Sequence, residues 1–305
     1  MKIDAIRQLY VVLVPAVDPQ PALDRAGFIA GLSGAHIKLV AQGFDSDLEH
    51  NPLLNEEQRQ REREQWIEVH RRWLHGLLAE TRKQHPDAEA QLLYSAAPVT
   101  ELLSECPPGS DALIVKSAVR HHPMRALLLP PEEGELLRRS PLPVWIPFNR
   151  TPLQRILACV VTPPDGVPGD RPQREIIETA RSIATHTGAD LNLLHCYAPL
   201  SPQLLFDADI ASADPGQSSA LRQHHRQALA PLLKASGITE AQLLMVEGQP
   251  ERVVPAEGGK VAGTLVVMGA TTRGALERAI EGNTIERVQP QLSCDLLVCP
   301  AAPGS

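Results

Sequence analysis

The chain has 305 residues, a formal net charge of −7, a hydrophobic fraction of 43% and an aromatic fraction of only 3%. This length favours two domains, and the scarcity of aromatic residues predicts cores built from aliphatic parallel strands. The negative charge argues against nucleic-acid binding, which needs a basic face. Because no apolar run approaches ~20 residues and no signal-peptide pattern opens the chain, we expect a cytoplasmic protein that binds no membrane.

In the first half of the chain, short apolar runs alternate with segments of helical periodicity, a pattern typical of a parallel α/β sheet. The predicted elements are strand 9–14, helix 21–32, strand 36–41, helix 55–85, strand 92–95, helix 99–104, strand 113–116, helix 132–139 and strand 144–146. Asn55 is a candidate N-cap of the long helix, and Pro86 is its stop signal. One apolar side of this helix is expected to face the core: Trp66, Val69, Trp73 and Leu77.

The second half repeats the same order of elements. They are strand 155–161, helix 173–187, strand 191–196, helix 217–235, strand 242–246, helix 251–261, strand 265–268, a helix that follows Gly282, and strand 294–298. Gly188 is a suitable residue to end the first of these helices. The polar, proline-containing residues 148–154 mark a boundary, so we predict domains at 1–150 and 151–305.

The two halves align as an internal repeat when Ser117 is placed over Gly269, at an offset of 152 residues. The same offset places Pro130 over Gly282. Proline has no N–H that a phosphate could accept from, so the first copy is expected to lack a phosphate-binding loop.

The segment from 264 to 284 in the second copy reads as a buried strand, a glycine turn, a loop and the start of a helix. Glycines let backbone N–H groups approach a ligand, and a helix N-terminus favours an anion. A plain strand-to-helix turn explains the same pattern, so both interpretations stay open on these residues alone.

This segment resembles the universal stress protein family, whose nucleotide-binding members carry Gly-x-x-Gly-x9-Gly followed by Ser, Thr or Asn after the fourth strand. Gly269 matches the first glycine and Gly282–Asn283 the last pair, whereas Thr272 departs from the second glycine. Val246 to Pro250 also looks like the family's exit from its third strand. The likeness covers nearly the whole chain, and the first copy resembles the degenerate N-terminal half of the tandem two-domain E-type members.

The resemblance implies an α/β fold with two tandem Rossmann-like, adenine nucleotide alpha hydrolase-like domains, each a five-stranded parallel sheet sandwiched by helices. It also implies nucleotide contacts in the second domain at Val161, Thr162, Met268, Gly269, Thr272, Arg273, Gly282, Asn283 and Thr284. Val161 and Thr162 would lie by the base and ribose, where the family usually has an aspartate. Arg273 would supply a counter-charge to phosphate.

Two functions follow from the resemblance and the residues. The first is a stress-response regulator or sensor that binds ATP or another adenine nucleotide in the C-terminal domain, with magnesium only as the companion of the nucleotide. The alternative is a protein-interaction scaffold, or a binder of a more apolar ligand, with no enzymatic activity. No catalytic residues are expected, because the P-loop and nucleophile-elbow motifs are absent, although weak incidental ATP hydrolysis stays open. No metal ligands are expected either, because the chain has no Cys-x-x-Cys pair.

The resemblance also implies how the two domains associate. In the family, domains pair through the last strand, so strands 144–146 and 296–298 are expected to form an intrachain pseudo-dimer, and a homodimer of the whole chain stays open.

The five sparse cysteines suggest reduced, buried thiols. His121–His122 are read as solvated rather than ligating, and His224–His225 as surface residues, because adjacent helical side chains point ~100° apart.

Overall fold

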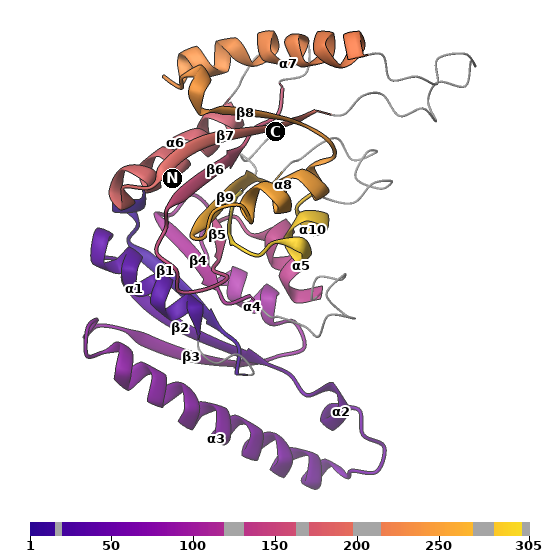
Figure 1. Cartoon of the computed structure of the whole chain (residues 1–305). Coiled ribbons are helices and arrows are strands. Elements are labelled where there is room, and N and C mark those ends of the chain that lie inside the picture. The colour runs from indigo at the N-terminus through magenta and orange to yellow at the C-terminus, as the bar shows by residue number, and fades with distance from the viewer. Residues whose placement is uncertain (16–19, 119–130, 163–170, 198–214, 271–283, 301–305) are drawn as a thin grey trace. The chain divides into compact units, whose positions relative to one another are not determined.

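The computed structural model describes residues 1–15, 20–118, 131–162, 171–197, 215–270 and 284–300. The chain separates into two compact units. The N-terminal unit is Ile3–Arg150, and the C-terminal unit is Thr151–Ser305 together with Met1–Lys2. Each unit consists of parallel strands with helices packed against them (Figure 1).

The N-terminal unit has the order of elements that the hydrophobic pattern predicts. Its elements are the 3₁₀ turn η1 (Ile3–Ala5), β1 (Gln8–Leu13), α1 (Pro21–Ser33), β2 (His36–Gly43), α2 (Ser46–Glu49), α3 (Glu56–Thr81), β3 (Glu89–Tyr94), α4 (Pro98–Ser104), β4 (Ala112–Lys116), α5 (Pro131–Arg139) and β5 (Val144–Ile146). The short helix α2, which Asp45 caps by accepting a hydrogen bond from the Leu48 N–H, was not predicted.

The C-terminal unit follows the same plan. Its elements are β6 (Arg155–Cys159), α6 (Arg171–Thr187), β7 (Asp190–Tyr197), α7 (Pro215–Ala235), the 3₁₀ turn η3 (Glu240–Gln242), β8 (Leu243–Glu247), α8 (Pro250–Gly258), β9 (Thr264–Gly269), α10 (Thr284–Val288), the 3₁₀ turn η4 (Gln289–Gln291) and β10 (Asp295–Cys299). Gly188 ends α6 in a left-handed conformation with φ of 71°, as its position predicts.

The strand order within each unit is the same. The N-terminal unit has the order β3-β2-β1-β4-β5, and the C-terminal unit the order β8-β7-β6-β9-β10. Every neighbouring pair within a unit is parallel. The predicted fold class, with two five-stranded parallel Rossmann-like sheets, is therefore confirmed.

Helices cover both faces of the C-terminal sheet, and glycines show how closely they pack. A Cβ added at Gly258 of α8 would lie 3.3 Å from Val266 of β9. Gly269, three residues further along β9, faces the opposite side because side chains alternate along a strand. A Cβ at Gly269 would lie 2.9 Å from the δ-methyl group of Ile176 in α6. Helices α6 and α8 therefore lie on opposite faces of this sheet.

The long helix α3 begins at the predicted residue, but it ends earlier than predicted and exposes a residue that was expected in the core. Asn55 and Gln58 form a reciprocal capping box at the N-terminus, whereas the helix ends at Thr81 rather than at residue 85. The expectation that Val69 belongs to the core is wrong, because its side chain is 52% exposed. Trp66, on the same predicted side of the helix, is half-buried, and its indole occupies the space in front of Gly43. The apolar stripe is thus narrower than the sequence spacing suggests.

Two further helix boundaries differ from the predictions. Helix α8 ends at Gly258 instead of residue 261, and the helix after Gly282 is only the single turn α10 before η4 begins. Pro290 lies inside η4, where its missing N–H is tolerated. None of the helices in the described part of the chain is long and apolar enough to cross a membrane.

Candidate functional site

The strand order creates a switch point in each unit, where consecutive connections leave toward opposite sides of the sheet. In the C-terminal unit it lies between β6 and β9, since β7 follows β6 on one side and β9 flanks it on the other. Ligands of open α/β sheets bind in the crevice outside the carboxyl ends of strands at this point. The edge of the sheet that is formed by the carboxyl ends of its strands is called the carboxyl edge.

The chain after β6 brings two of the predicted site residues to this edge. Val161 is 38% exposed, although it is apolar, and Thr162 is half-exposed. The Val161 backbone N–H donates to Oε1 of Gln173 in α6 at 3.1 Å, which fixes the start of the connection. Exposure of a valine at the end of a buried strand is compatible with contact to a flat ring system.

Strand β9 and the short helix α10 supply the other described residues of the predicted site. Met268 is buried near the end of the strand, and Gly269 packs against Ile176, so the missing side chain of Gly269 makes room for α6. Thr284 is half-buried as the first residue of α10. The other predicted contacts, Thr272, Arg273, Gly282 and Asn283, lie outside the described residues, as do His121 and His122.

The corresponding edge of the N-terminal unit is filled by the unit's own side chains. Ser117 Oγ accepts a hydrogen bond from the Ala22 N–H in the first turn of α1 and donates to Oε1 of Gln20, each at 3.2 Å. Gln20 in turn donates to the Val14 carbonyl at 2.6 Å. A helix N–H that a ligand could engage is therefore satisfied internally.

A buried ion pair completes this filled edge. Lys116 Nζ lies 2.6 Å from Glu133 Oε1 in α5, and the side chains are 6% and 0% exposed. Burial makes such a pair dependent on both partners. Under the repeat alignment, Met268 and Ile285 hold the equivalent positions in the C-terminal unit, and both are buried and apolar. The two edges therefore differ in chemistry at matched positions.

Two histidines meet near the carboxyl edge of β7, which the sequence did not reveal. His195 Nδ1 lies 3.0 Å from the Val160 carbonyl, and its Nε2 lies 3.1 Å from Nδ1 of His225 in α7. His224 is exposed as predicted, whereas His225 is half-buried, so the surface assignment of His225 is wrong. A histidine inside the apolar run of β7 was the available signal.

Burial lowers the pKa of His195, and this effect outweighs its hydrogen bond to Val160. Burial likewise lowers the pKa of His225, aided by its neighbour His224. Both imidazoles are therefore neutral near pH 7.

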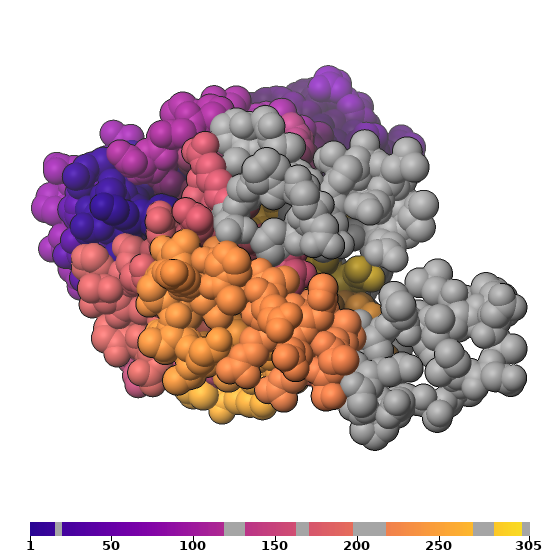
Figure 2. Space-filling model, turned by 90° about the horizontal axis from the view of Figure 1, so that it is seen from above, coloured from indigo at the N-terminus to yellow at the C-terminus, as the bar shows by residue number. Residues whose placement is uncertain are grey.

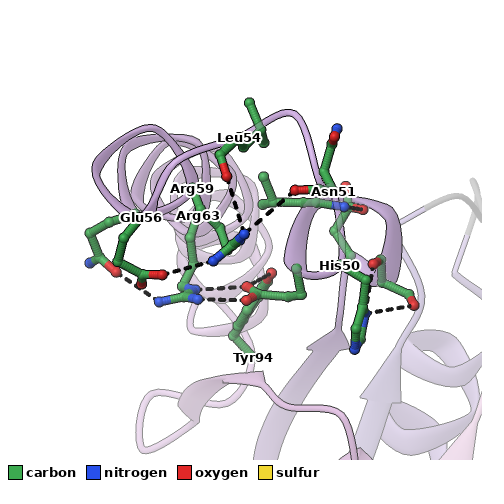
Figure 3. Close-up of polar contacts among 12 residues, drawn as sticks. His50, Asn51, Leu54, Glu56, Arg59, Arg63 and Tyr94 are labelled. Atoms are coloured by element: carbon green, nitrogen blue, oxygen red, sulfur yellow. Dashed lines mark hydrogen bonds and ion pairs between the residues drawn. The ribbon is translucent and has the colours of Figure 1, made fainter.

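A second polar cluster ties α2 and α3 to the end of β3 in the N-terminal unit (Figure 3). Arg63 donates two hydrogen bonds to the carboxylate of Glu49, at 2.7 and 2.5 Å, and the Tyr94 hydroxyl donates to the same carboxylate at 2.7 Å. These bonds, Arg63 first, lower the pKa of Glu49 from 4.5 to about 2. All polar partners in this cluster belong to the chain itself, so it acts as a structural clamp.

All five cysteines are free thiols. Three are buried, and Cys159 and Cys196 are half-buried. Burial raises the pKa of Cys196 to about 12 and, with the charge of Asp295, that of Cys294 to about 12. These thiols are protonated near neutral pH and are poor nucleophiles and poor metal ligands.

Taken together, the fold and its carboxyl edges define a tandem α/β protein of Rossmann-like topology with one filled and one apolar-walled edge. Residues 160–300 match the family model described as the universal stress protein family. The chain is 28% identical to Universal stress protein E of Escherichia coli strain K12, covering 96% of this chain and 93% of that one. It is 26% identical to the Universal stress protein E homolog of Haemophilus influenzae, covering 95% and 96%. Residues 160–300 therefore carry a universal stress protein domain.

Solved structures agree on the fold. A putative universal stress protein from Pseudomonas aeruginosa superposes with a TM-score of 0.71 at 23% identity, covering 98% of this chain and 94% of that one. A universal stress protein from Archaeoglobus fulgidus superposes with a TM-score of 0.60 at 17% identity, covering 96% and 98%. The chain therefore has the fold of these universal stress proteins.

Proposed function

We propose that this protein is a stress-response regulator that binds an adenine nucleotide, ATP being the first candidate, at the carboxyl edge of β6 and β9. The N-terminal unit binds none in this proposal. The protein signals by its bound state rather than by turnover. One observation carries the proposal: four of the five described site residues, Val161, Thr162, Met268 and Gly269, flank the switch point of the C-terminal sheet.

The contrast between the two units supports an asymmetric protein. The matched edge of the N-terminal unit is closed by Ser117, Gln20 and the Lys116–Glu133 pair. The C-terminal edge has an exposed Val161 and apolar residues where that ion pair stands. A ligand with a flat apolar ring and a polar tail suits such an edge, since ligand sites combine apolar walls with a few polar groups.

The association of the two units through strands 144–146 and 296–298 is part of the proposal. Chemical cross-linking of cysteines introduced on these two strands, Val144→Cys with Val298→Cys, tests it under non-reducing conditions. A bridge that forms within one chain supports the pseudo-dimer. Bridges found only between chains support the homodimer in its place, and the absence of both contradicts the pairing.

The nucleotide proposal is tested on the purified chain without added ligand. Denaturation releases any bound molecule, and mass spectrometry identifies it; an adenine nucleotide is the expected result. Added ATP should raise the melting temperature of ligand-free protein, because a ligand that binds only the folded state stabilises it. Lack of both effects contradicts nucleotide binding, and a released apolar molecule supports the alternative of an apolar ligand.

Reciprocal substitutions at the matched turn positions locate the binding. Gly282→Pro removes a backbone N–H from the C-terminal copy and should abolish the stabilisation by ATP. Pro130→Gly at the aligned position of the N-terminal copy is the control and should leave it unchanged. Equal binding by the parent and the Gly282→Pro variant overturns the assignment of the site.

A further inference from the structure

The peptide group that joins Val160 to the exposed Val161 is held at both of its polar ends. Strand β6 ends at Cys159, so this peptide group lies just beyond the strand. The Val160 carbonyl lies 3.0 Å from Nδ1 of His195, and the Val161 N–H donates to Oε1 of Gln173 at 3.1 Å. Both partners are side chains, one from β7 and one from α6, and together they fix the plane of the peptide group.

His225 of α7 supports His195 from the other side of the imidazole. A carbonyl can only accept, so His195 carries its proton on Nδ1 and presents a lone pair on Nε2. His225 Nδ1 lies 3.1 Å from this Nε2 and donates to it. His195 is 2% exposed, and both of its ring nitrogens are paired within the protein, as a buried polar side chain requires. His225 therefore helps to hold His195 in the tautomer that binds Val160.

The N-terminal unit holds the matched carbonyl in a different way. The residue that follows β1 is Val14, and its carbonyl accepts from Nε2 of Gln20 at 2.6 Å. Continued by one residue, the strand register places Gln42 of β2 level with Val14, as it places His195 of β7 level with Val160. Gln42 donates instead to a carbonyl in α4, at 3.1 Å. The histidine arrangement is therefore specific to the unit that has the proposed ligand site.

We propose that His195, His225 and Gln173 are positioning residues of the C-terminal ligand site. This role rests on the proposed function, because the three side chains would orient Val161 and Thr162 toward the adenine ring without touching the ligand themselves. Val161 is 38% exposed, so a rotation of the peptide group before it would move the surface that the ring contacts. A surface that is fixed before binding needs less ordering when the ligand arrives, which favours affinity.

The tautomers of the two histidines test the hydrogen-bond chain without any ligand. Burial keeps both rings neutral near pH 7 by lowering the pKa of each. Imidazole ¹⁵N NMR of the full chain should then show a proton on Nδ1 and a lone pair on Nε2 for both His195 and His225. Loss of a signal in the His225→Leu variant assigns His225. A proton on Nε2 of neutral His195 overturns the proposal, because Nδ1 then has none to donate to Val160.

The affinity of the full chain for ATP, measured by isothermal calorimetry, tests the positioning role. Gln173→Leu and His225→Leu each remove one hydrogen bond and should each weaken ATP binding about three- to tenfold. His225→Asn keeps an amide N–H close to the place of the imidazole Nδ1 and should restore most of the affinity. His195→Leu should weaken binding at least as much where circular dichroism shows that it folds; otherwise the variants of the half-buried His225 and Gln173 decide.

The neighbouring His224 provides the matched control, because it is exposed on α7, which is orange in Figure 2. His224→Leu should leave the affinity for ATP unchanged. An equal loss in the His224 and His225 variants overturns the proposal, and so does a parent-like affinity in both the His225→Leu and Gln173→Leu variants. A parent chain that binds no ATP contradicts the proposed function and, with it, the role of these residues in binding, whereas the tautomers decide the hydrogen-bond chain separately.

Discussion

Lys116 and Glu133 form a buried ion pair in the N-terminal unit, with 2.6 Å between Nζ and Oε1. Lys116 also donates to the Ser117 carbonyl at 3.3 Å, so the pair joins the end of β4 to α5. The pair closes the edge at which the C-terminal unit is proposed to bind its ligand. Its energetics can be tested with residues that the chain itself uses at the matched positions.

Removal of one partner should be costly, because it leaves a buried charge without compensation. We expect Glu133→Gln to lower the free energy of unfolding by about 3 kcal/mol, as measured by urea denaturation. The double variant Lys116→Met/Glu133→Ile copies the C-terminal unit and should lose much less, since well-packed apolar residues often replace a buried pair. A double variant as unstable as the single one would show that the pair is worth more than its apolar substitute.

The clamp of Glu49, Arg63 and Tyr94 predicts a pH dependence of stability at acidic pH (Figure 3). The pKa of Glu49 is about 2 in the folded chain, against 4.5 for an ordinary glutamate. The unfolded chain therefore takes up the proton first, and stability falls as the pH drops from 4.5 toward 2. Above pH 4.5 the contribution is fully present.

Urea denaturation at a series of acidic pH values checks this dependence. Glu49→Gln should flatten the acidic slope relative to the parent, because the titrating group is gone. Tyr94→Phe removes the weaker of the two hydrogen-bond donors and should give an intermediate slope. An acidic slope that Glu49→Gln leaves intact would assign the dependence to other carboxylates.

Gly43 is required for space rather than for an unusual backbone angle. A Cβ at this position would lie 2.3 Å from two atoms of the Trp66 indole. The indole stacks on the His70 ring, with 3.7 Å between ring centroids, and makes an edge contact with the Tyr94 ring, with 5.0 Å between centroids. Gly43→Ala should therefore destabilise the unit by about 1–3 kcal/mol, the usual cost of overpacking.

Gly31 offers a matched control within α1. A Cβ at Gly31 meets nothing within 4 Å, so Gly31→Ala should gain about 0.5–1 kcal/mol from helix propensity. Thermal and urea denaturation of both variants give the comparison. Equal effects of the two substitutions would refute the packing role of Gly43.

The features that sequence analysis recovered are those carried by local patterns. Strand β5 has the predicted bounds, and Asn55 caps α3, because apolar runs and capping residues act within a few positions. The grouping of Val161 and Gly269 at one edge also follows, since parallel strands place their carboxyl ends together. The fold was therefore predictable nearly in full.

Features that depend on contacts distant in the sequence could not be predicted. His195 and His225 are 30 positions apart and meet only because α7 packs beside β7. Val69 has the spacing of a core residue, yet the face it belongs to is too far around α3 to be covered. Periodicity gives the direction of a side chain around its helix, but not the width of the surface that buries it.

Gly269 and Ile176 give a prediction about the proposed site itself. The position in front of Gly269 is occupied by the δ-methyl group of Ile176, 2.9 Å from an added Cβ, and the γ-carbon is at 3.6 Å. This methyl group is the flexible end of its side chain, so Gly269→Ala should cost only about 1 kcal/mol. Ile176→Val removes the same methyl group and should cost about 0.5–1.5 kcal/mol alone.

The double variant should be more stable than the sum of the two changes predicts, because the new methyl group fills the space that the other vacates. A double-mutant cycle by urea denaturation measures this coupling. ATP should stabilise Gly269→Ala as much as the parent, since the missing side chain serves the packing of α6. A loss of ATP response without a loss of stability would instead show that the ligand approaches Gly269 directly.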